Sequence, residues 1–119
     1  MKWVVVFAEE FDAEFTKFPR DVQTALLAKA RMLECFGPQL GRPHVDTLKE
    51  SKHANMKELR FDAADGAWRA AFAFDTLRQA VVLVAGDKSG MSEKRFYRSL
   101  IAKADERFDD YLTQLNKEA

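Results

Sequence analysis

Apolar and polar residues alternate along this chain in patterns that predict, in order, a strand, two helices, three strands and a last helix. Residues 3–7 form a β-branched and aromatic run, which is typical of a buried strand. Phe11, Phe15 and Phe18 then follow at helical spacing, and Pro19 closes or restarts that helix. The first elements are therefore a strand and a short helix.

A second helix is predicted over residues 21–36, because its apolar residues recur every three or four positions and form one stripe. Gly37 and Pro38 end it, with glycine just after the last helical turn and proline beyond. Residues 39–55 are polar and show no period, so they predict a loop. A loop of that length in a small domain is more often functional than a short one.

The second half of the sequence predicts three strands, over residues 56–62, 68–75 and 80–85. Residues 64–66 form a hairpin turn between the first two strands, and the third strand is apolar almost throughout, as expected for a central position. Ser92 can cap a last helix, which carries an apolar stripe along its length.

The order of these elements predicts an α+β fold in one domain that spans residues 1–119. We expect an antiparallel sheet, with an N-terminal helical hairpin and a C-terminal helix packed on one face. The other face is then free to form a concave binding surface, which the polar residues of the strands identify.

Charge is balanced over the whole chain but not along it. Nineteen Lys and Arg residues oppose nineteen Asp and Glu residues. Residues 37–98 carry a net charge of +3, whereas the segments before and after them carry −1 and −2. The mildly basic middle fits an anionic partner, although chance unevenness on a neutral surface explains the same numbers. Strong binding of naked nucleic acid through charge alone is not expected.

The sequence disfavours metal sites, disulfides, cofactor binding and a place in or across a membrane. The only histidines, His44 and His53, lie nine apart in the predicted loop, and Cys35 is the only cysteine, so neither a metal site nor an internal disulfide is predicted. The phosphate-binding loop and nucleophile-elbow motifs are missing, and no cofactor is expected. The sequence has neither a signal-peptide pattern nor a membrane span, which predicts a cytoplasmic protein without a membrane partner.

The remaining candidates are polar residues on the strands and at the start of the last helix. Guanidinium groups suit phosphate, and RNA cleavage needs no metal when a base takes the 2′-hydroxyl proton and cations stabilise the pentavalent phosphate. The candidate catalytic residues are Glu58, Arg60, Arg69, Lys88, Tyr97 and His53. The candidate RNA-binding residues are Lys57, Lys94, Arg95 and Arg98. The same side chains are also consistent with solvated ion pairs that contribute little, and Tyr97 with a core position.

Four segments carry a resemblance to a known family: residues 56–61 (MKELRF), 65–72 (DGAWRAAF), 81–88 (VVLVAGDK) and 96–97 (FY). In this order and spacing they resemble the RelE/ParE superfamily of toxins, and most of all its phage-derived HigB-like branch. The resemblance covers nearly the whole chain. It implies the toxin of a type II toxin–antitoxin module, held inactive by a cognate helix-turn-helix antitoxin encoded beside it.

The resemblance further implies a metal-independent endoribonuclease. It would cut mRNA in the ribosomal A site, inhibit translation and leave a 2′,3′-cyclic phosphate and a 5′-hydroxyl. Carried over by position, Arg60 and Arg69 match the two sheet arginines of that family. Lys88 matches the basic residue after the last strand, and Tyr97 matches the tyrosine early in the last helix.

Some positions depart from the family pattern. The lysines that serve RelE as base and phosphate ligand fall on Met56 and Glu58, and one of the two basic residues expected after the last strand is Asp87. The hypothesis from the sequence is therefore that the two arginines and the lysine named above hold the phosphate, while Glu58 or His53 is the base.

Two other functions stay open. The first is a non-enzymatic inhibitor of DNA gyrase of the ParE kind, which the missing lysines favour. The second is a non-toxic phage-derived binding protein. An RNase arrests translation first, whereas a gyrase poison induces the DNA-damage response, so the phenotype on expression separates them.

Overall fold

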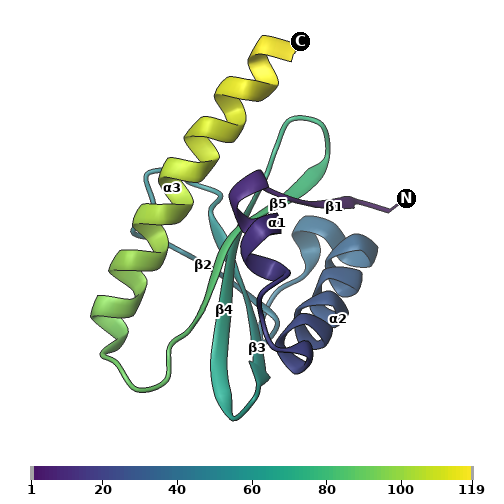
Figure 1. Cartoon of the computed structure of the whole chain (residues 1–119). Coiled ribbons are helices and arrows are strands. Elements are labelled where there is room, and N and C mark those ends of the chain that lie inside the picture. The colour runs from purple at the N-terminus through teal and green to yellow at the C-terminus, as the bar shows by residue number, and fades with distance from the viewer. Residues whose placement is uncertain (1, 119) are drawn as a thin grey trace.

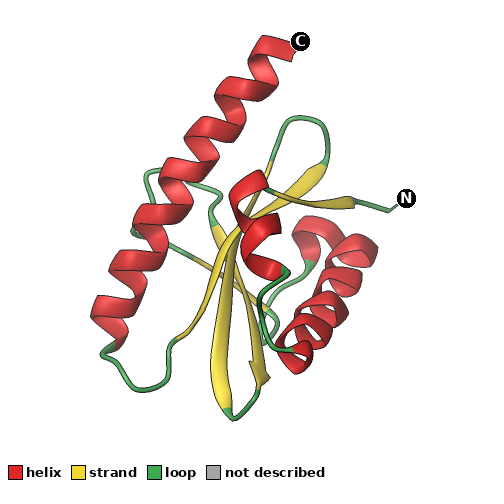
Figure 2. Cartoon of the chain, in the orientation of Figure 1, coloured by secondary structure: helices red, strands yellow, loops and turns green. Residues whose placement is uncertain are grey.

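The computed structural model describes residues 2–118. They form a five-stranded sheet, three α-helices and one short 3-10 helix (Figures 1 and 2). The elements in chain order are β1 (Val4–Phe7), α1 (Glu9–Phe15), α2 (Arg20–Phe36), η1 (Gly37–Gln39), β2 (Val45–Thr47), β3 (Lys57–Ala63), β4 (Gly66–Phe74), β5 (Gln79–Asp87) and α3 (Glu93–Glu118). The α+β class predicted from the sequence is confirmed. Within the described residues no helix is both long enough and apolar enough to cross a membrane.

The strand order in the sheet is β1-β5-β4-β3-β2. β3, β4 and β5 are successive antiparallel neighbours, as the sequence predicts, and β2 adds to β3 in the same manner. β1 instead runs parallel to β5, so the expectation of a purely antiparallel sheet is wrong for this strand. Parallel neighbours need a long crossover, and all the elements between β1 and β5 supply one.

β2 lies inside the segment for which the sequence predicts a loop. Its three residues pair with β3, so that Val45 lies opposite Leu59 and Asp46 opposite Glu58. A strand of three residues is too short to show a period of two, and pairing with a distant segment defines it. This short strand is the element that brings Asp46 to the polar face of β3.

The helices cover both faces of the sheet, which corrects the expectation that they pack on one face. Trp68 packs against Phe18, beside the start of α2, whereas its neighbour Arg69 lies on the opposite face with Glu58, which contacts Tyr97 of α3. Figure 1 shows α2 and α3 on opposite sides of the sheet.

The apolar composition of the central strands explains why both faces are covered. Consecutive residues of β5, such as Val81 and Val82, point to opposite faces, and both are fully buried. A strand that is apolar on both faces must be covered on both. The buried stripe of α3, which includes Phe96, Leu100 and Phe108, covers one of them. The polar face of β3 and β4 therefore lies beside α3 and is not an open surface.

α3 is tied to the rest of the fold by Arg107. Its guanidinium donates to both carboxylate oxygens of Glu14 in α1, at 2.8 and 2.7 Å, and to the backbone carbonyl of Leu83 in β5 at 2.8 Å. Such a two-pronged ion pair fixes orientation as well as distance. It holds the helix whose first turns carry Tyr97.

Candidate functional site

The candidate site begins with two arginines that face each other across β3 and β4. Arg60 and Arg69 are register partners and share a face of the sheet. Arg69 faces Glu58, which binds Tyr97 of α3, and Arg60 lines a pocket with Tyr97. Like charges directly opposite each other destabilise a strand pair unless an anion lies between or beside them. Glu58, two residues before Arg60 on the same face, is such an anion, because its carboxylate forms an ion pair with Arg69.

The carboxylate of Glu58 is buried between Arg69 of the sheet and Tyr97 of α3. Its Oε1 accepts a hydrogen bond from the hydroxyl of Tyr97 at 2.8 Å and lies 3.7 Å from Nε of Arg69. Arg69 is itself buried, and its Nη1 donates to the carbonyl of Trp68 at 2.8 Å. Its buried Nε has no hydrogen-bond partner within the described residues and faces Glu58 as an ion pair.

Burial sets the protonation behaviour of this cluster. Removal from water raises the pKa of Glu58, against the opposing effects of the Tyr97 hydrogen bond and of Arg69 and Arg60. Burial, together with the bond to Glu58, raises the pKa of Tyr97 to about 12. The tyrosine therefore stays a hydroxyl at neutral pH, and the glutamate is a carboxyl group that exchanges its proton closer to neutrality than an exposed one.

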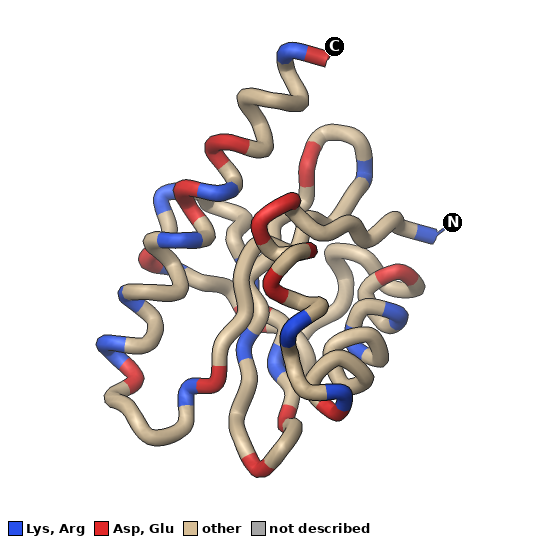
Figure 3. The backbone as a smooth tube through the Cα atoms, viewed as in Figure 1, with Lys and Arg blue, Asp and Glu red and all other residues tan. Residues whose placement is uncertain are grey.

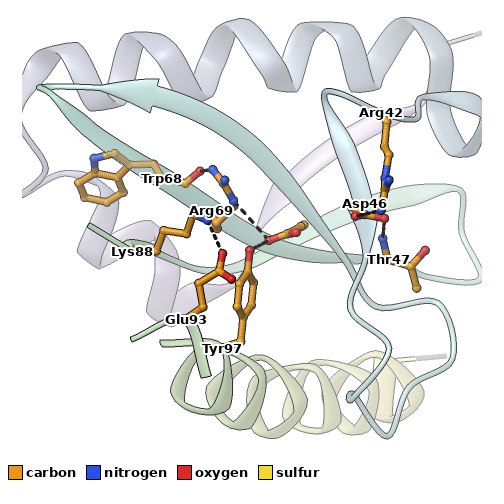
Figure 4. A network of polar contacts seen from close by, with 9 residues as sticks. Arg42, Asp46, Thr47, Trp68, Arg69, Lys88, Glu93 and Tyr97 are labelled. Atoms are coloured by element: carbon orange, nitrogen blue, oxygen red, sulfur yellow. Dashed lines mark hydrogen bonds and ion pairs between the residues drawn. The ribbon is translucent and has the colours of Figure 1, made fainter. Parts of the chain in front are cut away.

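Lys88 follows directly after β5 and lies beside Arg69 (Figure 4). Its Nζ donates to Glu93 at 2.6 Å, and this bond lowers the pKa of Glu93 (Figure 4). Glu93 is well exposed, so the pair is a solvated one of small energetic weight. A phosphate can replace this carboxylate as the partner of Lys88.

β2 adds residues that the sequence analysis missed. Asp46 accepts hydrogen bonds from Arg42 at 2.8 Å and from the backbone N–H of Thr47 at 2.9 Å. Arg42 is the main cause of the lowered pKa of Asp46, followed by that N–H. A pocket of about 410 Å³ is lined by Arg42 and Asp46 together with Glu58, Arg60 and Tyr97. The β-branched residues Val45 and Thr47 around Asp46 are the only sequence signal of the strand that places it here.

His53 does not join this cluster. Its Nε2 lies 2.8 Å from Oδ1 of Asp109, and its ring packs edge-on against Phe108. Asp109 follows Tyr97 by twelve residues on α3, which is about 18 Å along a helix. The structure therefore brings Glu58 together with the two arginines and leaves His53 at the other half of α3.

Three of the candidate RNA-binding residues lie next to the site, and the fourth lies on the opposite face of the sheet. Lys94, Arg95 and Arg98 are exposed on the first turns of α3, next to the site. Lys94 and Arg98 line a hollow of about 550 Å³ that also includes Tyr97. Lys57 is adjacent to Glu58 in β3 and so points to the opposite face, where its Nζ lies 3.5 Å from the hydroxyl of Thr47.

Among the described residues, no group of three or more His, Cys, Asp or Glu side chains is arranged to hold a metal ion. The groups that the site does offer are guanidiniums, an ammonium, two carboxyls and a phenol. Such a set can bind a phosphodiester and move protons around it.

The arrangement of sheet and helices is RelE-like. It superposes on the structure of a mutant of the Escherichia coli toxin RelE in the free state with a TM-score of 0.61, over 87% of this chain and 97% of that one, at 15% identity. Residues 13–109 match the family described as Phage derived protein Gp49-like, and the chain belongs to this family.

Two relatives come from Mycobacterium tuberculosis. The candidate toxin HigB3 is 40% identical over 108 residues, which cover 91% of this chain and 92% of HigB3. The candidate toxin HigB2 is 40% identical over 107 residues, which cover 89% of this chain but 53% of HigB2. The expectation of a HigB-like member of the RelE/ParE superfamily is thereby confirmed.

Proposed function

We propose that this protein is the toxin of a type II toxin–antitoxin module and that it cleaves mRNA on the ribosome. Membership of the Gp49-like family and 40% identity to two HigB relatives support the toxin. The observation that carries the cleavage chemistry is the juxtaposition of Arg60 and Arg69 beside the buried Glu58 and its hydrogen-bond partner Tyr97.

In this proposal the two arginines bind the scissile phosphate. Planar guanidiniums can each donate two hydrogen bonds to phosphate oxygens and stabilise the charge that builds up in the transition state. Lys88 adds a third cation when the phosphate displaces Glu93. Glu58, with Tyr97 bound to it, is a proton-transfer group of the site. No metal ion or cofactor takes part in this reaction.

The basic residues Lys94, Arg95 and Arg98 on α3 extend the RNA contact beyond the reacting phosphate. Lys57 lies outside this track because it points to the other face. A nearly neutral protein binds free RNA weakly, so the ribosome is the partner that presents mRNA to the site. A helix-turn-helix antitoxin is the second partner. The ribosome and the antitoxin are both cytoplasmic, so the protein acts in the cytoplasm.

The test is a short pulse of expression in a bacterial host, without the neighbouring antitoxin gene, followed by mapping of new mRNA 5′ ends. We expect new ends in phase with codons, and we expect them to vanish in Arg60→Ala and Arg69→Ala. Arg60→Ala is the sharper variant, because Arg69 also partners the buried Glu58. Arg31→Ala, an exposed arginine on α2, is the matched control and should leave the ends unchanged.

Growth arrest without new 5′ ends contradicts the proposal and points to a gyrase inhibitor of the ParE kind, especially if the DNA-damage response is induced. Absence of arrest points to a non-toxic binding protein. Co-expression of the antitoxin must restore growth and remove the new ends if the arrest comes from a toxin–antitoxin module.

A further inference from the structure

β2 places a second carboxylate directly opposite Glu58. Asp46 and Glu58 are register partners on the same face, and both line the pocket that holds Arg60 and Tyr97. Side chains directly opposite each other in an antiparallel pair have Cβ atoms about 4.5–5.5 Å apart. The charge of Asp46 is near enough to raise the pKa of Glu58, and both carboxyls line the pocket in which one phosphodiester would lie.

The two carboxyls differ in their burial and in their hydrogen-bond partners. Glu58 is buried, and both of its polar contacts, from Tyr97 and Arg69, engage Oε1. Oε2 is thus the oxygen that can carry a proton. Asp46 is more exposed and accepts hydrogen bonds from Arg42 and from its own strand, which stabilise its ionised form.

The direction of the pKa shifts agrees with this geometry. The pKa of Glu58 is raised, chiefly by burial, and the nearby charge of Asp46 adds to the rise. The pKa of Asp46 is lowered, chiefly by Arg42. Pairs of carboxyls whose environments separate their pKa values commonly divide the roles of acid and base.

We propose that Asp46 is the general base and Glu58 the general acid of RNA cleavage at this site, an inference that rests on the proposed function. The Asp46 carboxylate takes the proton of the 2′-hydroxyl as the 2′-oxygen bonds to phosphorus. The bond from phosphorus to the 5′-oxygen breaks, and that oxygen takes the proton from Oε2 of Glu58. The products are a 2′,3′-cyclic phosphate and a 5′-hydroxyl, with Asp46 protonated and Glu58 ionised, and one proton exchange with water resets the pair.

The charged and titratable groups around the pair come from every element packed against it. From β2 and the adjoining loop they are Arg42, Lys49 and Glu50; from β3 and β4 they are Arg60 and Arg69; from α3 it is Tyr97. The arginines bind the phosphate and favour ionised carboxylates, whereas the burial of Glu58 raises its pKa and favours the protonated form that an acid needs.

The experiment measures single-turnover cleavage of mRNA on purified programmed ribosomes as a function of pH. For the unmodified protein we expect a bell-shaped profile, whose acidic limb reports Asp46 and whose alkaline limb reports Glu58. Asp46→Asn should lower the rate about 100-fold or more and remove the acidic limb. Asp46→Glu should restore a large part of the rate together with that limb.

Arg42→Ala removes the ion-pair partner of Asp46 and leaves the proposed base itself in place. Arg42 lowers the pKa of Asp46, so its removal should move the acidic limb to higher pH and keep the limb itself. If Asp46→Asn and Arg42→Ala lower the rate equally without changing the profile, Asp46 only anchors β2 and the inference is overturned. If Asp46→Asn cleaves like the unmodified protein, the inference fails while the proposed function stands. If the unmodified protein does not cleave, both fail.

Discussion

At the scale of single residues, Glu58 couples the stability of the fold to pH. Burial raises its pKa in the folded protein above the value for the unfolded chain. Its contribution to stability is therefore complete below the unfolded pKa and is lost as pH rises through the folded one. We expect the free energy of unfolding of the wild type, relative to Glu58→Gln, to be constant below about pH 4 and to fall as pH rises above it. Urea denaturation over a pH series measures this difference.

Tyr97→Phe is the matched variant for that measurement. The hydrogen bond from Tyr97 lowers the pKa of Glu58, so its loss should extend the fall in stability to higher pH. A stability difference that rises with pH would mean that Arg69 and Tyr97 outweigh burial, and that folding lowers the pKa of Glu58.

The residues of the site were predictable from the sequence to different degrees, for physical reasons. Alternation along two strands joined by a short hairpin is enough to predict that Arg60 and Arg69 share a face. The position of Asp46 depends on the pairing of a three-residue strand, for which two β-branched residues are the only local signal. His53 is displaced by a contact with Asp109, far away in sequence, that only the packed helix creates.

At the scale of secondary-structure elements, the end of α2 depends on Gly37. Its φ of +56° is a conformation that side chains other than glycine rarely adopt. A Cβ here would also collide with the indole of Trp3, which is held edge-on to Phe74 and under the guanidinium of Arg78. We expect Gly37→Ala to lower the free energy of unfolding by about 2–4 kcal/mol, measured by urea denaturation.

Variants of two other glycines distinguish the cost of backbone strain at Gly37 from the cost of the collision with Trp3. Gly41 has neither a positive φ nor an atom near its Cβ position, so Gly41→Ala should change stability little. Gly90 has a φ of +81° but open space, so Gly90→Ala should cost about 1 kcal/mol. If Gly37→Ala costs no more than Gly90→Ala, the Trp3 ring moves aside and the packing argument is wrong.

Elements with long periodic patterns were the ones predicted well. α2 and α3 carry continuous apolar stripes, and the turn between β3 and β4 has positive φ at Ala64 and Asp65, as a tight hairpin requires. The direction of β1 and the face that α3 covers were predicted wrongly. Periodicity reports which side of an element is buried, but it does not report against which neighbour.

At the scale of the whole molecule, charge is distributed unevenly over a neutral protein. Lys94, Arg95 and Arg98 gather on the first turns of α3 near the site, whereas α1 carries mainly acidic residues (Figure 3). A positive region at the site attracts RNA, and a negative region elsewhere limits binding to other phosphates. One end of α3 therefore carries the charge that contacts RNA, while the balanced charge of the whole chain keeps binding of free RNA weak.

This distribution predicts that RNA cleavage depends on salt concentration and that only some basic residues of α3 contribute to this dependence. Each phosphate contact adds a slope of about −0.7 to a plot of log binding constant against log salt for single-stranded RNA. We expect kcat/KM for cleavage on programmed ribosomes to fall with added potassium chloride at constant magnesium. Lys94→Ala and Arg98→Ala should each flatten that slope by about 0.7. Lys103→Ala and Lys117→Ala, farther along the same helix, remove the same charge and should leave the slope unchanged. Equal flattening by all four variants would mean that RNA follows the full length of α3, and no flattening by any would place the RNA track off this helix.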